Sequence, residues 1–201
     1  IEAYTELYRV WPDVGLRAAL VRLLDLMLTK LYVEAEGKLH VYLDAELEPV
    51  HDDWSLGHDI EAAWLVEHTA DVLAQDTVSA EEAALLRDIH AMCRRLEDAV
   101  LPRALEAIVL PDGRPGLWHA QAVVGGQLDR TRGWGVQAEA ICALVNAAIR
   151  REDASYLEQA VQLWDSMACY LVDSTPGGEW HQELDLDQRP KRLNIADPWK
   201  A

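Results

Sequence analysis

Residues 37–49 read GKLHVYLDAELEP, and residues 178–190 read GEWHQELDLDQRP. Both stretches follow the pattern G-x-apolar-H-x-x-L-D-x-acid-x-x-P, and Gly116 begins a weaker third copy that reads GLWH. The two clear copies lie 141 residues apart. Together with the third copy, this spacing predicts an internal repeat of roughly 60–80 residues, and such repeats stack so that each unit buries its apolar face against its neighbours.

Apolar residues at spacings of three and four predict helices between these stretches, because such spacing lines one face of a helix. The predicted helices span roughly residues 13–30, 56–75, 79–107, 134–150 and 153–173. The long polar connections between them contain the repeated pattern and show no comparable run of strands. We therefore expect an all-α fold, in which helical hairpins with short β-hairpin-like loops form an incomplete arc of a ring within a single domain, residues 1–201.

Composition narrows the class of ligand. The chain has 201 residues, half of them hydrophobic, with 35 acidic against 18 basic residues and a formal net charge of -17. Nucleic-acid binding requires clustered Lys and Arg, so this charge argues against a nucleic-acid partner and favours a neutral, hydroxyl-rich ligand. The sequence contains no apolar run of membrane-spanning length, and its N-terminus does not resemble a signal peptide, so we expect no membrane partner.

The three cysteines, Cys93, Cys142 and Cys169, lie far apart within apolar helical patterns. Their spacing matches neither a disulfide framework nor a zinc site. We interpret them as buried thiols in a reducing compartment, which predicts a cytoplasmic protein.

The long loops of a helical-hairpin ring collect at one end, above the starts of the helices that follow them, and we expect the cleft there. Ser55 is a candidate N-cap, which places His58 and Glu61 on one face of the first turn of the next helix. An imidazole beside a carboxylate suits proton transfer near neutral pH. The alternatives are that both residues only cap the helix, or that they bind a metal, although HExxH spacing is absent.

The second loop leads into Trp134 and Glu139 at the start of another helix. Aromatic faces stack on the C–H faces of sugars and carboxylates accept their hydroxyl hydrogens, so this pair suits a carbohydrate cleft. Burial of Trp134 in the core is the alternative. The chain has eight tryptophans and no phenylalanine, and we assign Trp64, inside a helix, to packing.

Three stretches in this order resemble the N-acylglucosamine 2-epimerase superfamily, and within it the cellobiose 2-epimerase branch: SLGHDIEAAWLV, GWGVQAEAICALVNA and GEWHQELDLDQRPK followed by WKA. The resemblance implies an (α/α)6 barrel that epimerises reducing sugars without a metal or redox cofactor. It also implies that two histidines exchange the proton at C2 through a cis-enediol. By its motifs, His58, Glu61 and Glu139 match catalytic positions, and Trp199 matches a tryptophan of the substrate cleft.

The chain departs from the family pattern at two places. Trp134 is followed by Gly135, where cellobiose 2-epimerases typically carry a second tryptophan. The second catalytic histidine of the family would fall beyond Ala201, and its N-terminal sugar-contacting arginine and histidine would precede Ile1. The resemblance therefore implies the middle and later part of a longer enzyme, lacking N-terminal and C-terminal portions of the barrel.

These observations predict a cytoplasmic sugar 2-epimerase that acts on a reducing aldose or a disaccharide, with a small-molecule sugar as partner and a homodimer as its assembly. An aldose–ketose isomerase shares the enediol and is the first alternative. A non-catalytic carbohydrate-binding protein on the same scaffold is the second. A glycoside hydrolase would need two carboxylates across the scissile bond instead of two histidines.

Overall fold

Six α-helices make up most of the computed structural model, which describes residues 1–51, 53–76, 79–108, 113, 116–117, 122–123, 127–175 and 177–191. The predicted all-α class is confirmed, and all five predicted helices are present with ends within a few residues of the prediction. The helices are α1 Glu2–Val10, α2 Val14–Leu26, α3 Leu56–Ala74, α4 Ala80–Ile108, α5 Trp134–Arg151 and α6 Ala154–Tyr170, with a π-helical turn, Met27–Leu31, after α2.

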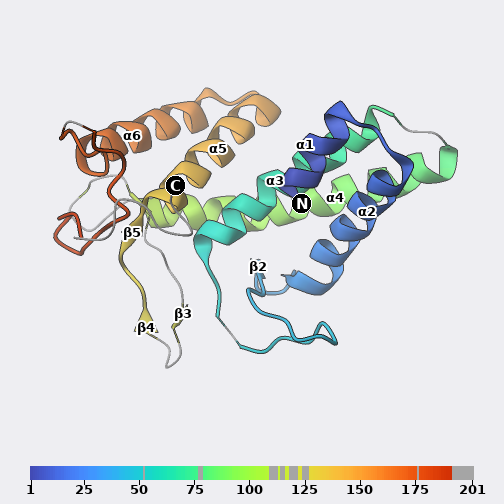
Figure 1. Cartoon of the computed structure of the whole chain (residues 1–201), viewed down its shortest axis with the longest axis horizontal. Coiled ribbons are helices and arrows are strands. Elements are labelled where there is room, and N and C mark those ends of the chain that lie inside the picture. The colour runs from blue at the N-terminus through green and yellow to red at the C-terminus, as the bar shows by residue number, and fades with distance from the viewer. Residues whose placement is uncertain are drawn as a thin grey trace.

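The helices form three consecutive hairpins: α1 with α2, α3 with α4, and α5 with α6 (Figure 1). The first helices of the hairpins form a row in which α3 contacts both α1 and α5. The second helices pack against their own partners, most extensively α4 on α3 and α6 on α5. This is the predicted arc of helical hairpins.

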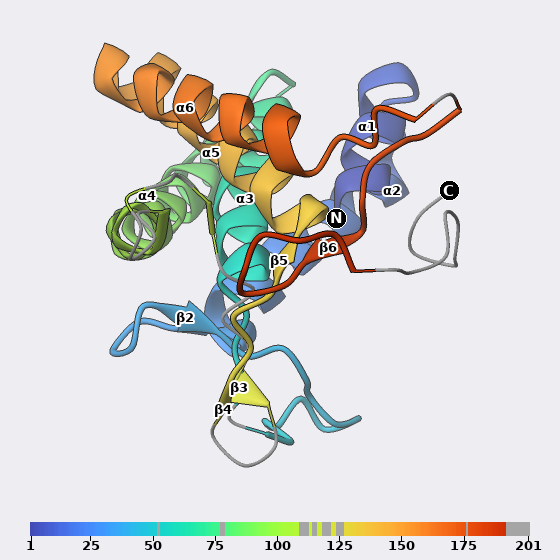
Figure 2. The ribbon, with the colours of Figure 1, turned by 90° about the vertical axis from the view of Figure 1, so that its left-hand side faces the viewer.

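The connections alternate in length. Three residues separate α1 from α2 and two separate α5 from α6, whereas the hairpins are joined by long segments that carry the strands. These strands form three antiparallel pairs: β1 Tyr32–Val33 with β2 Lys38–Leu39, β3 Ala122–Val123 with β4 Gln127–Leu128, and β5 Arg132–Gly133 with β6 Glu183–Leu184. Figure 2 shows β2, β3 and β4 together at one end of the helices, where the cleft was expected.

The two clear copies of the repeated sequence form the same turn. Asp44 Oδ1 accepts the backbone N–H groups two and four residues ahead, at 3.0 and 2.9 Å, and Asp185 Oδ1 does the same, both at 2.9 Å. The third residue after each aspartate, Leu47 or Gln188, has a φ of 65°. This shared geometry confirms the internal repeat in the structure.

Helix α1 was not predicted, because its apolar residues do not mark its buried face. Thr5 and Tyr8 are the buried residues of this helix, whereas Tyr4 and Leu7 are exposed. The Thr5 hydroxyl lies 2.9 Å from that of Thr69 on α3. A buried polar pair of this kind satisfies its hydrogen bonds internally, so the helix packs on α3 without an apolar stripe.

The main hydrophobic core lies between the helices, and a smaller cluster is formed by Met167, Leu171 and Leu184. Each fully buried Leu or Ile contributes roughly 1.5–3 kcal/mol relative to an exposed position, and the core includes Leu20, Leu24, Ile60, Leu73, Leu96, Leu144 and Leu163. Among the described residues, none of the helices combines the length and the apolar character that crossing a bilayer requires. The prediction of three buried thiols is right for Cys93 but wrong for Cys142 and Cys169, which are exposed, because both lie on helix faces that no other described element covers.

Candidate active site

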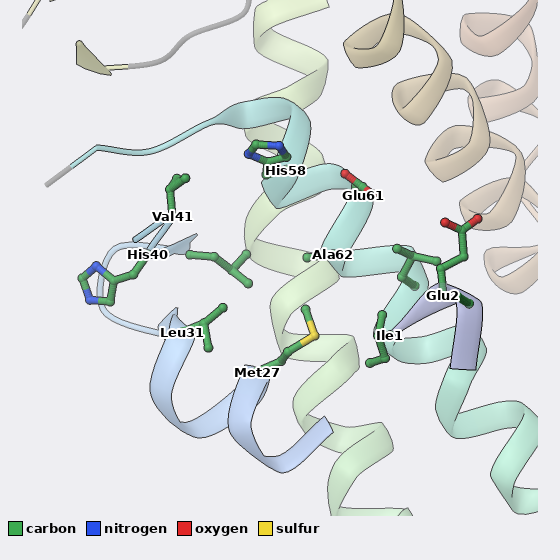
Figure 3. Close-up of a pocket in the computed structure, with 12 residues that line it drawn as sticks. Ile1, Glu2, Met27, Leu31, His40, Val41, His58, Glu61 and Ala62 are labelled. Carbon is green, nitrogen blue, oxygen red and sulfur yellow. The ribbon is translucent and has the colours of Figure 1, made fainter. Parts of the chain in front are cut away.

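His58 and Glu61 lie near the start of α3, at the edge of an open cavity. Ser55 is the N-cap, as predicted, and its hydroxyl accepts the backbone N–H of His58 at 3.4 Å. The His58 side chain is exposed and Glu61, one turn further on, is half-buried. Figure 3 shows both side chains projecting from α3 on the same side of the helix. The helix start therefore holds an imidazole and a carboxylate at the edge of one open space.

The first turn of α5 lies beside that of α3. Gly57 makes this approach possible, because a Cβ at this position would lie 2.9 Å from Cγ2 of Val136 on α5. The close contact brings Trp134 and Glu139, both half-buried on α5, to the same side as His58. The two helix starts that were singled out separately in the sequence therefore form one site.

Two cavities meet at His58 and Glu61. The first has a volume of about 430 Å³ and lies between the starts of α3 and α5, where Trp134, Glu139 and Glu183 also line it. The second has a volume of about 500 Å³ and is more apolar (Figure 3). Its remaining lining residues are Ile1, Glu2, Ala3, Met27, Leu31, Leu39, His40, Val41, Ala62 and Leu65. We take the first cavity as the candidate active site, because it joins the polar groups of both helices.

Burial and mutual repulsion favour the protonated forms of the carboxyls in this site. Burial raises the pKa of Glu61 above its usual range, and the nearby charge of Glu2 raises it further. Burial likewise raises the pKa of Glu139; the hydrogen bond from Trp64 opposes this shift, and the charges of Glu61 and Glu2 add to it. Each of these carboxyls therefore takes up its proton at a higher pH than a carboxyl in water does.

Trp64 packs against the hydrophobic core, as predicted, and also contributes to this site. Its indole N–H donates to Oε2 of Glu139 at 2.9 Å, which links α3 to α5. Trp64 lies one helical turn after Glu61 and is therefore its neighbour on the surface of α3. That spacing was the available signal, but a tryptophan in an alanine-rich helix is also typical of packing.

The structure thus brings four of the five predicted site residues to one cavity: His58, Glu61, Trp134 and Glu139. The fifth, Trp199, lies outside the described residues, and so do Trp118 and His119 of the middle repeat copy. Within the described part of the chain, no group of three His, Cys, Asp or Glu side chains could hold a metal ion. The catalytic and sugar-binding roles of these residues stay predictions.

Comparison with known proteins identifies the family. Residues 2–200 match the N-acylglucosamine 2-epimerase (GlcNAc 2-epimerase) family. The chain belongs to this family. The match extends over nearly all of the chain and therefore includes both helix starts and all three copies of the repeated pattern.

Similar proteins carry the name cellobiose 2-epimerase. The chain is 31% identical over 202 residues to one from Ruminococcus albus and 29% identical over 201 residues to one from Dictyoglomus turgidum. In both cases it is covered completely and spans 48% of the relative, about half its length. The solved cellobiose 2-epimerase from Bacillus thermoamylovorans B4167 superimposes with a TM-score of 0.80 at 32% identity, over 99% of this chain and 47% of the other. This similarity confirms the predicted arc of an (α/α)6 barrel.

Proposed function

We propose that the protein is a sugar 2-epimerase that acts on a reducing aldose or disaccharide. The observation that carries this proposal is the single cavity in which His58, Glu61, Trp134 and Glu139 meet. A base, two carboxyls and an aromatic plane are the groups that proton exchange on a sugar requires. The names of the relatives support the same class of reaction.

In the proposed reaction, the sugar ring opens first. Opening exposes the aldehyde at C1, and this carbonyl makes the proton at C2 acidic. The His58 imidazole takes the C2 proton or returns it. The electron pair left on C2 forms the C1–C2 double bond of the cis-enediol, in its enediolate form, and the negative charge moves to the oxygen on C1. An acid on the opposite face of the enediol then delivers a proton to C2 and inverts its configuration. The family resemblance assigns that second role to a histidine whose position would lie beyond Ala201.

The other residues have supporting roles in this proposal. Glu61 and Glu139 bind hydroxyls of the open-chain sugar, and burial raises the pKa of both carboxyls above its usual range. Trp134 provides an aromatic face for the sugar ring.

Isotope exchange in D2O tests this function directly. The protein, expressed from its complete reading frame, is incubated with cellobiose, mannobiose or glucose, and the products are followed by proton NMR. We expect the 2-epimer to form with deuterium at C2, seen as loss of the H2 signal. A ketose as the main product would instead establish the isomerase. Sugar binding without exchange would establish a carbohydrate-binding protein.

The cytoplasmic location and the homodimer stay predictions. The three cysteines, which are free thiols in the structure, support a reducing compartment.

A further inference from the structure

Two units of the repeat carry matching sequences at the start of their first helices. Residues 57–61 of α3 read GHDIE, and residues 135–139 of α5 read GVQAE. Gly and Glu coincide at the two ends of this alignment, and the middle position is Asp59 in one unit and Gln137 in the other. Both middle residues are buried. The two helix starts therefore provide an internal comparison of a carboxylate with an amide at equivalent places.

The two middle residues make the same contact with the loop that precedes them. Asp59 Oδ1 accepts the backbone N–H of Leu39 at 2.9 Å, and Gln137 Oε1 accepts the backbone N–H of Leu117 at 2.7 Å. In both units the acceptor lies 20 residues after the donor. This contact fixes each loop to the helix that follows it.

The second half of the contact differs between the units. Gln137 Nε2 donates to the carbonyl of Leu117 at 2.7 Å, so the amide pairs with both backbone groups of one residue. Asp59 cannot donate in this way when ionised. Its Oδ2 is buried without a hydrogen-bond partner among the described residues and lies 3.5 Å from Nη1 of Arg103 on α4. A neutral amide therefore completes the loop contact by itself, whereas the carboxylate directs one oxygen to a cation.

The charge at Asp59 is unfavourable for stability. Burial raises its pKa to about 6, against the opposing effects of the Leu39 N–H and of the Arg103 and Lys38 charges. The ionised form is therefore less favourable in the folded protein than in water. Gln137 forms the equivalent loop contact without a charge, so the loop contact does not explain why position 59 carries a carboxylate. Buried groups with shifted pKa values are concentrated at functional sites, which points to a functional reason.

Arg103 extends the contact toward His58. Its Nη1 donates to the carbonyl of Gly37, and its guanidinium carbon lies 5.0 Å from the centre of the Trp54 ring. Trp54 immediately precedes the N-cap Ser55 of α3. Arg103 therefore contacts both the tip of the loop before the site and the residue that leads into the His58 turn.

We propose that Asp59 is a positioning residue whose carboxylate holds Arg103 against Gly37 and Trp54 and thereby fixes the turn that carries His58. The inference rests on the proposed function for its catalytic consequence. Asp59 does not touch the substrate; it acts through Arg103 and through the backbone before α3. The unit that carries His58 has the Asp59 carboxylate. In the other unit, Val136 takes the place of His58 and Gln137 provides the amide.

The substitution Asp59→Gln tests this inference, because it installs the residue that the second unit uses. In the protein expressed from its complete reading frame, hydrogen exchange is measured by mass spectrometry on peptides covering residues 36–41 and 53–58. We expect the first segment to keep its protection and the second to exchange at least about tenfold faster. We expect kcat/KM for the 2-epimerisation to fall by about tenfold to a hundredfold, since misplacement of a reacting group by about 1 Å has effects of that size.

Glu67→Gln provides the matched control. Glu67 is another buried carboxylate of α3 that pairs with a guanidinium, that of Arg150 at 2.8 Å, and its pKa is also raised by burial. This variant should leave both peptides and kcat/KM unchanged.

Three results would overturn the inference: unchanged exchange at 53–58 in Asp59→Gln, equal loss of protection at both segments with a matching fall in Tm, or kcat/KM within twofold of the wild type. If the wild type acts on no sugar, the proposed function fails, and the two exchange measurements still decide whether Asp59 positions the His58 turn.

Discussion

At the scale of single residues, His58 is the group that distinguishes a catalytic site from a well-capped helix. Its side chain is exposed to both cavities, while its backbone N–H is bound by Ser55. The cap therefore does not need the imidazole. His58→Asn should lower kcat by roughly 10²–10⁴-fold, the usual contribution of a general acid–base group, with little change in Tm. Steady-state kinetics and thermal unfolding check this, and near-normal turnover would leave His58 with a structural role only.

Trp64 should act through Glu139. Replacing it with Phe keeps most of the aromatic packing but removes the indole N–H that donates to Oε2 of Glu139. Because that hydrogen bond lowers the pKa of Glu139 against the effect of burial, Trp64→Phe should raise this pKa further. We expect the limb of the pH–rate profile that reports the ionisation of Glu139 to move to higher pH. Trp164→Phe, on the exposed side of α6, is the matched control and should leave the profile in place.

Asp59 should make stability depend on pH in a direction opposite to that of a carboxylate whose pKa is lowered on folding. Its pKa rises from about 3.8 to about 6 on folding. The folded state therefore binds the proton more tightly, so the stabilisation by neutral Asp59 is complete below pH 4 and is lost as pH rises through 6. The loss amounts to about 3 kcal/mol. Between pH 4 and pH 7 the free energy of unfolding of Asp59→Asn should rise by this amount relative to the wild type; a constant difference would contradict the prediction.

At the scale of elements, the approach of α3 to α5 depends on Gly57. An added Cβ would meet Val136, whose branched side chain cannot easily turn away. Gly57→Ala should therefore lower the free energy of unfolding by about 1–3 kcal/mol through overpacking. Gly135 occupies the equivalent position in α5, and a Cβ there would meet no atom within 4 Å. Gly135→Ala should be neutral or stabilise by up to about 1 kcal/mol, because alanine favours the helix. Equal effects of the two substitutions in urea unfolding would argue against this packing.

Whether a helix could be predicted depends on how far apart along the chain the residues lie that stabilise it. Helix α5 was predicted at 134–150 and is present at Trp134–Arg151, because its apolar spacing is local. Helix α1 was not predicted, since its buried Thr5 is satisfied by a residue on another helix, 64 positions away. Local patterns predict which segments are helical, but polar contacts between helices depend on the assembled fold.

The residues of the site also divide into those that local sequence predicts and those that only the assembled fold brings together. The pair His58 and Glu61 follows from helical spacing, and the pair Trp134 and Glu139 follows from its position at the start of the helix after the second loop. The hydrogen bond from Trp64 to Glu139 joins residues 75 positions apart, and the contact between Asp59 and Leu39 crosses 20 positions and a loop. Neither contact has a local signal, because its partner is determined by how the repeat units pack.

At the scale of the whole molecule, charge restricts the substrate. The formal net charge is -17, and the described lining residues of the two cavities include Glu2, Glu61, Glu139 and Glu183 but no Lys or Arg. A phosphate monoester would bring about -1.5 to -2 further charges to these carboxyls, of which Glu183 is paired with Lys191 at 2.7 Å. Repulsion between exposed groups also reaches across about 10 Å at 0.1 M salt. We therefore expect the described part of the site to favour a neutral reducing sugar over a sugar phosphate.

The corresponding prediction concerns competition between sugars. Glucose 6-phosphate should inhibit epimerisation of a neutral sugar at least tenfold more weakly than glucose does, because its phosphate adds negative charge beside the carboxyls that line the described cavities. Raising NaCl from about 0.05 to 0.5 M should narrow this gap, since screening weakens the repulsion but leaves the sugar hydroxyl contacts intact. Inhibition constants for both sugars at the two salt concentrations provide the measurement. Equal inhibition at low salt would contradict the charge argument, and a gap that does not respond to salt would attribute the discrimination to cavity shape instead of to charge.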